Sequence, residues 1–241
     1  MSGSHSRPKT IDALHIELAK IVNLYKANCI NWTGRTNDTK EFYTEVIAYE
    51  LMRNPKEFEK FPDPVKRNSS YFRETHSIIE IDLTKSNRGE ENFAKRITGL
   101  ELDHLGSIKD FQIPLKDTSG DAGLGKIDLI SFKKDVNTLF LIELKYIGNK
   151  ETLLRALLES YTYFKIVDQN KLKKDFLDKY FNSDSLDKII IKSAILLVPG
   201  CTAYYELKEM EENERPMLKA LFLALDVNIF TLEFSVYVPK L

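Results

Sequence analysis

Three charged residues interrupt two apolar segments in the middle of the chain, and their types could support metal-dependent chemistry. Asp128 lies within the apolar segment 126–132, and Glu143 and Lys145 lie at the end of the next one, 139–144. Each segment has the length and composition of a strand, and the polar residues between them predict a hairpin. Side chains two residues apart in a strand share a face, and strand pairing would bring Asp128 close to the other two.

Charged groups in buried strands are costly to desolvate unless they pair or hold a metal. Asp128 and Glu143 would repel each other, and a hard cation such as Mg²⁺, with Mn²⁺ as a substitute, relieves this repulsion through oxygen ligands. A bound cation lowers the pKa of water and polarises a phosphoryl oxygen. Lys145 would orient or help to deprotonate that water and offset charge at phosphorus. The alternative is a structural salt bridge between Lys145 and either carboxylate.

Apolar spacing and breaker residues divide the chain into three parts. We expect residues 1–9 to form a polar, disordered tail, residues 10–75 a helical region and residues 76–241 the core. In the helical region we expect helices over about 11–25 and 38–53. In the core we expect strands at 77–83, 111–115, 126–132, 139–144, 189–198 and 229–238, and helices at 90–102, 150–167, 169–181 and 206–225. The fold class is therefore α/β, with an αβββαβ core, a mixed central sheet flanked by helices, and an N-terminal helical extension.

Composition excludes several classes of protein. A hydrophobic fraction of 43% with 29% charged residues is typical of a globular domain and not of a disordered or fibrous chain. The net charge of −1 means that nucleic-acid binding would depend on a local patch. Two cysteines far apart in the chain predict no disulfide framework, and no apolar run reaches the roughly 18–20 residues of a membrane span. We expect a cytoplasmic protein with no membrane segment and no signal peptide.

The hairpin motif resembles that of a known family. Gly-x-x-Asp-Leu-Ile at 125–130, followed by a strand ending in Ile-Glu-Leu-Lys at 142–145, is similar to the core motif of the PD-(D/E)xK nuclease superfamily, which has the restriction-endonuclease-like fold. The resemblance covers roughly residues 87–200, and the expected element order matches that fold. It implies that Asp128, Glu143 and Lys145 are the motif residues.

The resemblance also implies further metal ligands. The family carries a glutamate on the helix before its first core strand, and Glu90 is our candidate, with Glu91 as its close competitor. The backbone carbonyl of Leu144 would be another ligand. The alternative for Glu90 is a capping box that begins at Asn87.

Two cationic residues near the motif are candidates for substrate binding. Arg155 could contact phosphate from the helix at 150–167, although an ion pair with Glu159 one turn later is the simpler interpretation of both residues. Lys126 ends a Gly-x4-Gly-Lys segment that resembles part of a P-loop. That segment lacks the following Ser or Thr and precedes a strand, so we assign it to a turn from which Lys126 would reach a phosphate.

The leading hypothesis is a Mg²⁺-dependent nuclease that hydrolyses DNA phosphodiester bonds, an endonuclease of the restriction, defence or mobile-element type that the resemblance implies. The helical region would then supply substrate contacts or a homodimer surface. One alternative is a catalytically inactive module with the nuclease fold that serves in binding or assembly, which the near-neutral charge favours. Another is a small-molecule hydrolase that uses the same carboxylates.

Overall fold

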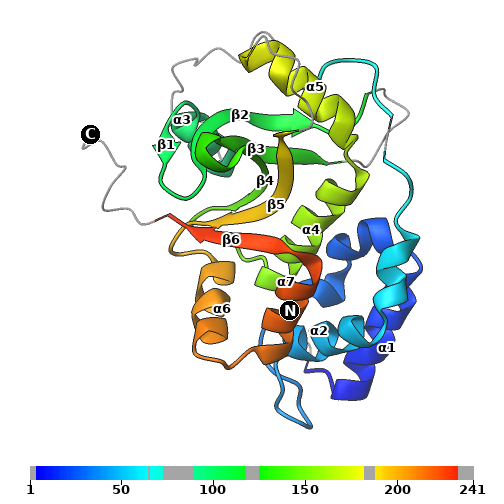
Figure 1. Ribbon diagram of the computed structural model, residues 1–241. Coiled ribbons are helices and arrows are strands. Elements are labelled where there is room, and N and C mark those ends of the chain that lie inside the picture. The colour runs from blue at the N-terminus through cyan, green and yellow to red at the C-terminus, as the bar shows by residue number, and fades with distance from the viewer. Residues whose placement is uncertain (1–3, 65, 73–88, 118–124, 182–187, 233–241) are drawn as a thin grey trace.

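Apolar segments between residues 101 and 231 form a six-stranded mixed sheet, seen in Figure 1 of the computed structural model. The structure describes residues 4–64, 66–72, 89–117, 125–181 and 188–232. The strands are β1 (Glu101–Leu102), β2 (Gly106–Pro114), β3 (Lys126–Lys133), β4 (Thr138–Lys145), β5 (Ile190–Leu197) and β6 (Val227–Thr231). They pair in chain order, antiparallel from β1 to β4 and parallel from β4 to β6.

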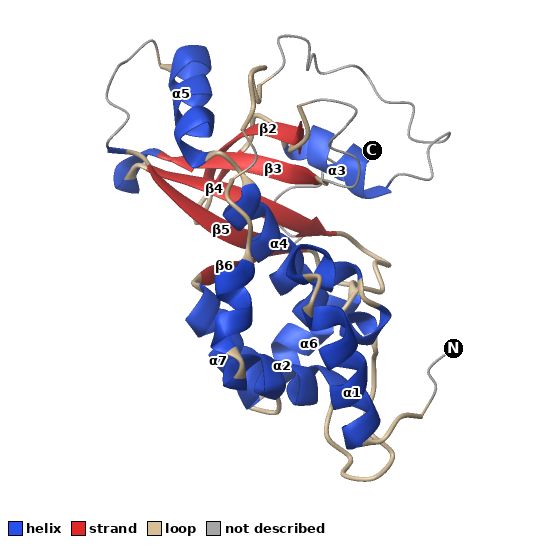
Figure 2. Ribbon diagram, turned by 90° about the vertical axis from the view of Figure 1, so that its right-hand side faces the viewer, coloured by secondary structure: helices blue, strands red, loops and turns tan. Residues whose placement is uncertain are grey.

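Helices cover both faces of this sheet. The helices are α1 (Arg7–Leu18), α2 (Tyr43–Arg53), α3 (Gly89–Ile97), α4 (Leu153–Ile166), α5 (Gln169–Tyr180), α6 (Thr202–Glu211) and α7 (Pro216–Leu225), and the short 3-10 turns are η1 (Ile21–Lys26), η2 (Asn28–Asn31), η3 (Pro55–Lys60) and η4 (Lys134–Val136). Figure 2 shows α1, α2, α6 and α7 gathered below the sheet, with α4 between them and the strands. The expected α/β class with a mixed sheet flanked by helices is confirmed.

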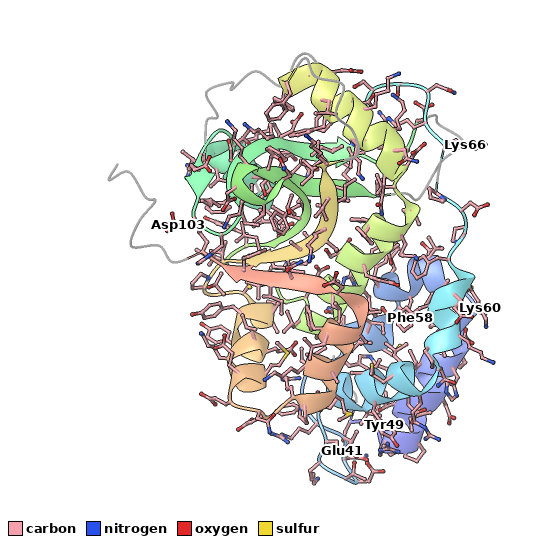
Figure 3. All side chains as sticks on the ribbon, viewed as in Figure 1. Glu41, Tyr49, Phe58, Lys60, Lys66 and Asp103 are labelled. Atoms are coloured by element: carbon pink, nitrogen blue, oxygen red, sulfur yellow. The ribbon has the colours of Figure 1, made fainter. Side chains whose placement is uncertain are left out.

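Two apolar cores follow from the alternation of side chains along the strands. Leu139 and Leu141 of β4 belong to the larger core, which also contains α4 and the helical region near the N-terminus. Phe140 and Ile142 point to the other face, where α3 covers them. In Figure 3, Glu41, Tyr49 and Lys60 mark the helical region, and Asp103 marks the turn between β1 and β2. None of the described helices is long and apolar enough to span a membrane.

Several expected boundaries differ from the structure. The helix expected at 206–225 is two helices, because Pro216 lacks an amide hydrogen and starts α7 after a turn in which Asn213 has φ +64°. The tail expected at 1–9 is helical from Arg7, where Pro8 suits the first turn. The helix expected from residue 38 begins at Tyr43, since Lys40 has φ +60° and Arg35 pairs with Phe42. The strand expected at 77–83 lies outside the described residues, as does the end of the strand expected at 229–238.

Candidate active site

The hairpin of β3 and β4 brings the three motif residues together. Leu129 pairs with Ile142, so the register places Asp128 opposite Glu143. Because residues two apart share a face, Lys145 lies on the same side of β4 as Glu143. This is the face covered by α4, so all three charged groups are buried beneath that helix at the end of the hairpin.

Asp128 has two neutral hydrogen-bond partners. Its Oδ1 accepts from Gln112 Nε2 at 2.9 Å, and its Oδ2 accepts from the amide of Leu144 at 3.0 Å. Among the ion pairs of the described residues, none includes this buried carboxylate. Burial, and next the nearby charge of Glu90, raise the pKa of Asp128 from 3.8 to about 7.

The ammonium group of Lys145 is surrounded by three carboxylates. Its Nζ donates to Glu143 Oε1 at 2.7 Å, to Glu159 Oε2 at 3.2 Å and to Glu151 Oε2. An ammonium group has three N–H donors, so these carboxylates occupy all of them. Burial lowers the pKa of Lys145, but the carboxylates, Glu143 foremost, outweigh burial and hold that pKa well above its usual value. Lys145 is therefore a cation at neutral pH.

Glu90 reaches the same site from the first turn of α3. Its Oε2 accepts hydrogen bonds from the amide of Tyr146 at 3.3 Å and from Asn149 Nδ2 at 3.4 Å. Burial raises the pKa of Glu90. Glu91 instead pairs with Lys95, 3.2 Å away along the same helix, so Glu90 is the glutamate of the two that faces the cleft. The capping partner considered for Glu90, residue 87, lies outside the described part of the chain.

The ion pair expected between Arg155 and Glu159 is not formed. Glu159 turns inward, where it accepts from Lys145 and from the hydroxyl of Tyr163 at 2.8 Å. Arg155 instead lies 2.8 Å from Glu151 Oε1. The buried ammonium group competes better for Glu159 because charges attract more strongly away from water.

These residues line a polar cleft of about 310 Å³. The lining residues are Glu90, Gln112, Lys126, Asp128, Glu143, Lys145, Asn149, Glu151, Glu159 and Tyr163. Five of them are carboxylates and two are lysines, so the lining carries a formal surplus of three negative charges. Lys126 is exposed and is the first residue of β3, so it lies at the start of the strand expected at 126–132 and not in the turn to which the segment ending at this residue was assigned.

Gln112 and Glu151 were not among the predicted site residues, and Glu159 was predicted to pair with Arg155. Gln112 has φ +50° inside β2, between the pairs Phe111–Leu129 and Ile113–Ile127, and this left-handed conformation is rare for a side chain other than glycine. Nothing in the local sequence predicts this backbone conformation of Gln112. The spacing of Glu159 and Tyr163 on one helix face was visible, but the contact with Lys145 depends on how α4 crosses β4.

The donor set of this site fits a hard divalent cation. Asp128, Glu143 and Glu90 offer only oxygen, and the buried Asp128 forms no ion pair with a described residue. In the arrangement seen here, no group of three or more His, Cys, Asp or Glu side chains of the described residues has the geometry of a formed metal site. Leu144 lies between Glu143 and Lys145, and its amide is bonded to Asp128.

Comparison with known proteins does not assign the chain to a family. No protein-family model, no curated protein and no solved structure matches it significantly.

Proposed function

We propose that this protein is a Mg²⁺-dependent nuclease with a restriction-endonuclease-like core. The observation that carries the proposal is the meeting of Asp128, Glu143 and Lys145 at the end of one antiparallel hairpin, in a cleft with surplus negative charge. Apart from the two-residue strand β1, the 3-10 turn η4 and the helix α5, the element order from α3 to β5 is α3-β2-β3-β4-α4-β5, which agrees with the αβββαβ order that the family resemblance implies. The mixed pairing, antiparallel from β2 to β4 and parallel from β4 to β5, supports the same core.

The residues of the site have separate roles in this proposal. Asp128, Glu143 and Glu90 would hold the cation, which supplies a polarised phosphoryl oxygen and a water of lowered pKa when bound. Gln112 and the Leu144 amide keep the Asp128 carboxylate in one orientation. Lys145, being protonated, would donate a hydrogen bond to an oxygen on which negative charge develops in the transition state, once one of its three carboxylate partners gives up its donor. Its high pKa makes it an electrostatic group and not a base.

We propose DNA as the substrate and internal cleavage as the reaction. The whole chain has a net charge of −1, so attraction to a phosphate backbone depends on cationic groups near the cleft. Lys126 at its exposed rim and Arg155 on α4 are such groups. A closed circular DNA tests the internal cleavage directly, because only an endonuclease cuts it.

The test is a cleavage assay on supercoiled plasmid, single-stranded DNA and RNA with Mg²⁺ or Mn²⁺. We expect the wild-type protein to convert plasmid to nicked or linear form, and Asp128→Asn and Lys145→Met to lose at least about a hundredfold in rate. Asp135→Asn and Lys134→Met are matched controls, since both residues are exposed in the turn of the same hairpin.

The other outcomes separate the alternatives. Cleavage that survives in Asp128→Asn would place the activity elsewhere and refute the proposed site. A folded wild-type protein that binds Mn²⁺ but cuts none of the three polymers would favour a hydrolase of small phosphate esters. A folded protein that binds no Mn²⁺ would favour an inactive binding module.

A further inference from the structure

The side chain of Glu151 bridges two cationic groups at the cleft. Its Oε2 accepts a hydrogen bond from Lys145 Nζ, and its Oε1 lies 2.8 Å from Arg155 Nε. One carboxylate therefore presents two oxygens to two cations that come from different elements, β4 and α4. Glu151 lies in the turn between these elements, where its amide donates to Asn149 Oδ1 at 2.8 Å.

Glu151 covers the accessible side of the Lys145 ammonium group. Its side chain is 25% exposed, compared with 13% for Glu159 and 5% for Glu143. Lys145 itself is 3% exposed, so an incoming group reaches Nζ most easily where Glu151 now lies. Glu151 also lines the cleft that contains Asp128.

The contact between Glu151 and Arg155 is poorly aligned. Although the ion-pair distance is 2.8 Å, Arg155 Nε is a buried donor without a hydrogen-bond partner of acceptable angle among the described residues. A buried donor that lacks a well-directed acceptor is costly, since it has lost its water. An oxygen that approached Nε in line would therefore gain a hydrogen bond that Glu151 does not supply.

We propose that Lys145 and Arg155 form a phosphate-binding site, and that Glu151 occupies this site until a phosphodiester group displaces it. A phosphodiester carries two non-bridging oxygens on one atom, as the carboxylate does, and guanidinium groups bind carboxylates and phosphates with the same geometry. The inference rests on the proposed function, because it places a backbone phosphate beside Asp128 and Glu143. Glu151 is then an internal competitor of the substrate.

The test is binding without metal. In EDTA, we would titrate full-length wild-type and Glu151→Gln proteins with a short fluorescently labelled DNA duplex and, separately, with inorganic phosphate. We expect Glu151→Gln to bind the duplex about fivefold more tightly, because a partly exposed ion pair opposes binding by up to about 1 kcal/mol. The double variant Glu151→Gln with Arg155→Gln should lose this gain.

Glu90→Gln is the matched control. Glu90 lines the same cleft and its replacement removes the same charge, but it contacts neither Lys145 nor Arg155. An equal gain in Glu90→Gln would overturn the proposal in favour of a general electrostatic effect, and no gain in Glu151→Gln would also overturn it. If Glu151→Gln does not fold, Glu151→Ala replaces it.

Cleavage by the wild-type protein is measured separately, so that the two proposals can fail independently. Tighter binding by Glu151→Gln, together with no cleavage by the wild-type protein, supports the phosphate site and refutes the nuclease. Cleavage by the wild-type protein, together with no tighter binding by Glu151→Gln, supports the nuclease and refutes the phosphate site. A gain with both ligands supports a site for isolated phosphate, whereas a gain with the duplex alone supports a site that requires the nucleic-acid backbone.

Discussion

The backbone amide of Leu144 donates a hydrogen bond of 3.0 Å to the Asp128 carboxylate, across the two strands of the hairpin. The residue between Glu143 and Lys145 therefore holds the aspartate of the neighbouring strand. Because the other Asp128 oxygen also accepts from a neutral donor, the carboxylate is stabilised by hydrogen bonds and forms no ion pair with a described residue, and burial outweighs the attraction of the nearby Lys145. The protonation state of Asp128 should therefore influence both stability and metal binding.

We expect the metal-free protein to lose stability between pH 5 and pH 8 because of Asp128. An aspartate carboxyl group ordinarily has a pKa of 3.8, which also applies to the unfolded chain, whereas the pKa of Asp128 in the folded protein is about 7. The native state thus binds more protons than the unfolded state in this window, and stability falls as the pH rises. Urea unfolding in EDTA should show a fall of about 2–3 kcal/mol in the wild type that Asp128→Asn lacks. Asp135→Asn should behave as the wild type, and parallel pH profiles for the wild type and Asp128→Asn would contradict the assignment.

Neighbouring glutamates of α3 should differ in their effect on metal binding. Glu90 faces the cleft, whereas Glu91 pairs with Lys95 away from it. Replacing Glu90 with Gln removes a carboxylate from the proposed donor set, so Mn²⁺ affinity measured by calorimetry should fall by about tenfold. Glu91→Gln should retain wild-type affinity, and equal losses in the two variants would refute a role specific to Glu90.

Gly125 should tolerate no side chain. A Cβ atom there would lie 2.0 Å from the hydroxyl oxygen of Tyr163, which donates to Glu159. Gly125→Ala should therefore displace Tyr163 and reduce the cleavage rate by about tenfold. Gly89→Ala is the control, since its Cβ would meet the ring of Tyr146 at an ordinary 3.4 Å. Wild-type activity in Gly125→Ala would mean that the position of Tyr163 does not matter.

The Tyr163 hydroxyl should matter for activity more than for stability. Tyr163→Phe removes the donor to Glu159, which contacts Lys145, and also the contact with the Tyr25 hydroxyl at 3.4 Å. We expect the maximal cleavage rate to fall by about tenfold and the unfolding free energy by about 1 kcal/mol. Tyr161→Phe is the control, since Tyr161 lies on the same helix but packs against Phe58 and Phe61, and it should leave the rate unchanged. A loss of stability with an unchanged rate would assign Tyr163 a structural role only.

Glu206 should contribute to the stability of the fold and lies outside the candidate active site. Its buried carboxylate accepts from the amide of Leu153 at 2.7 Å, at the start of α4, and lies 3.5 Å from Arg215. Glu206→Ala should lower the unfolding free energy by about 3 kcal/mol, because it leaves a buried amide and a buried guanidinium with fewer partners. Glu211→Ala, at an exposed ion pair of the same helix, should cost less than 1 kcal/mol by the same urea measurement. Equal losses would show that Glu206 contributes no more than a surface charge.

Glu206 also illustrates where prediction from sequence failed. The sequence predicts a single helix over 206–225 that begins at this residue. In the structure α6 begins at Thr202, ends at Glu211 and turns Glu206 toward the first amides of α4. The acceptor of this contact and its donor are 53 residues apart, so no local pattern could reveal it.

The sequence by itself determines the strands of the hairpin and the common face of Asp128, Glu143 and Lys145, because the alternation of side chains along a strand is a local property. Only the tertiary structure decides that Glu151 and Glu159 surround Lys145, that Arg155 pairs with Glu151, and that Gln112 orients Asp128. These contacts depend on how α4 packs across β4 and on a left-handed residue within β2. Packing between segments distant in the chain sets such distances, and it is governed by the shape of the whole core and not by the spacing of neighbouring residues.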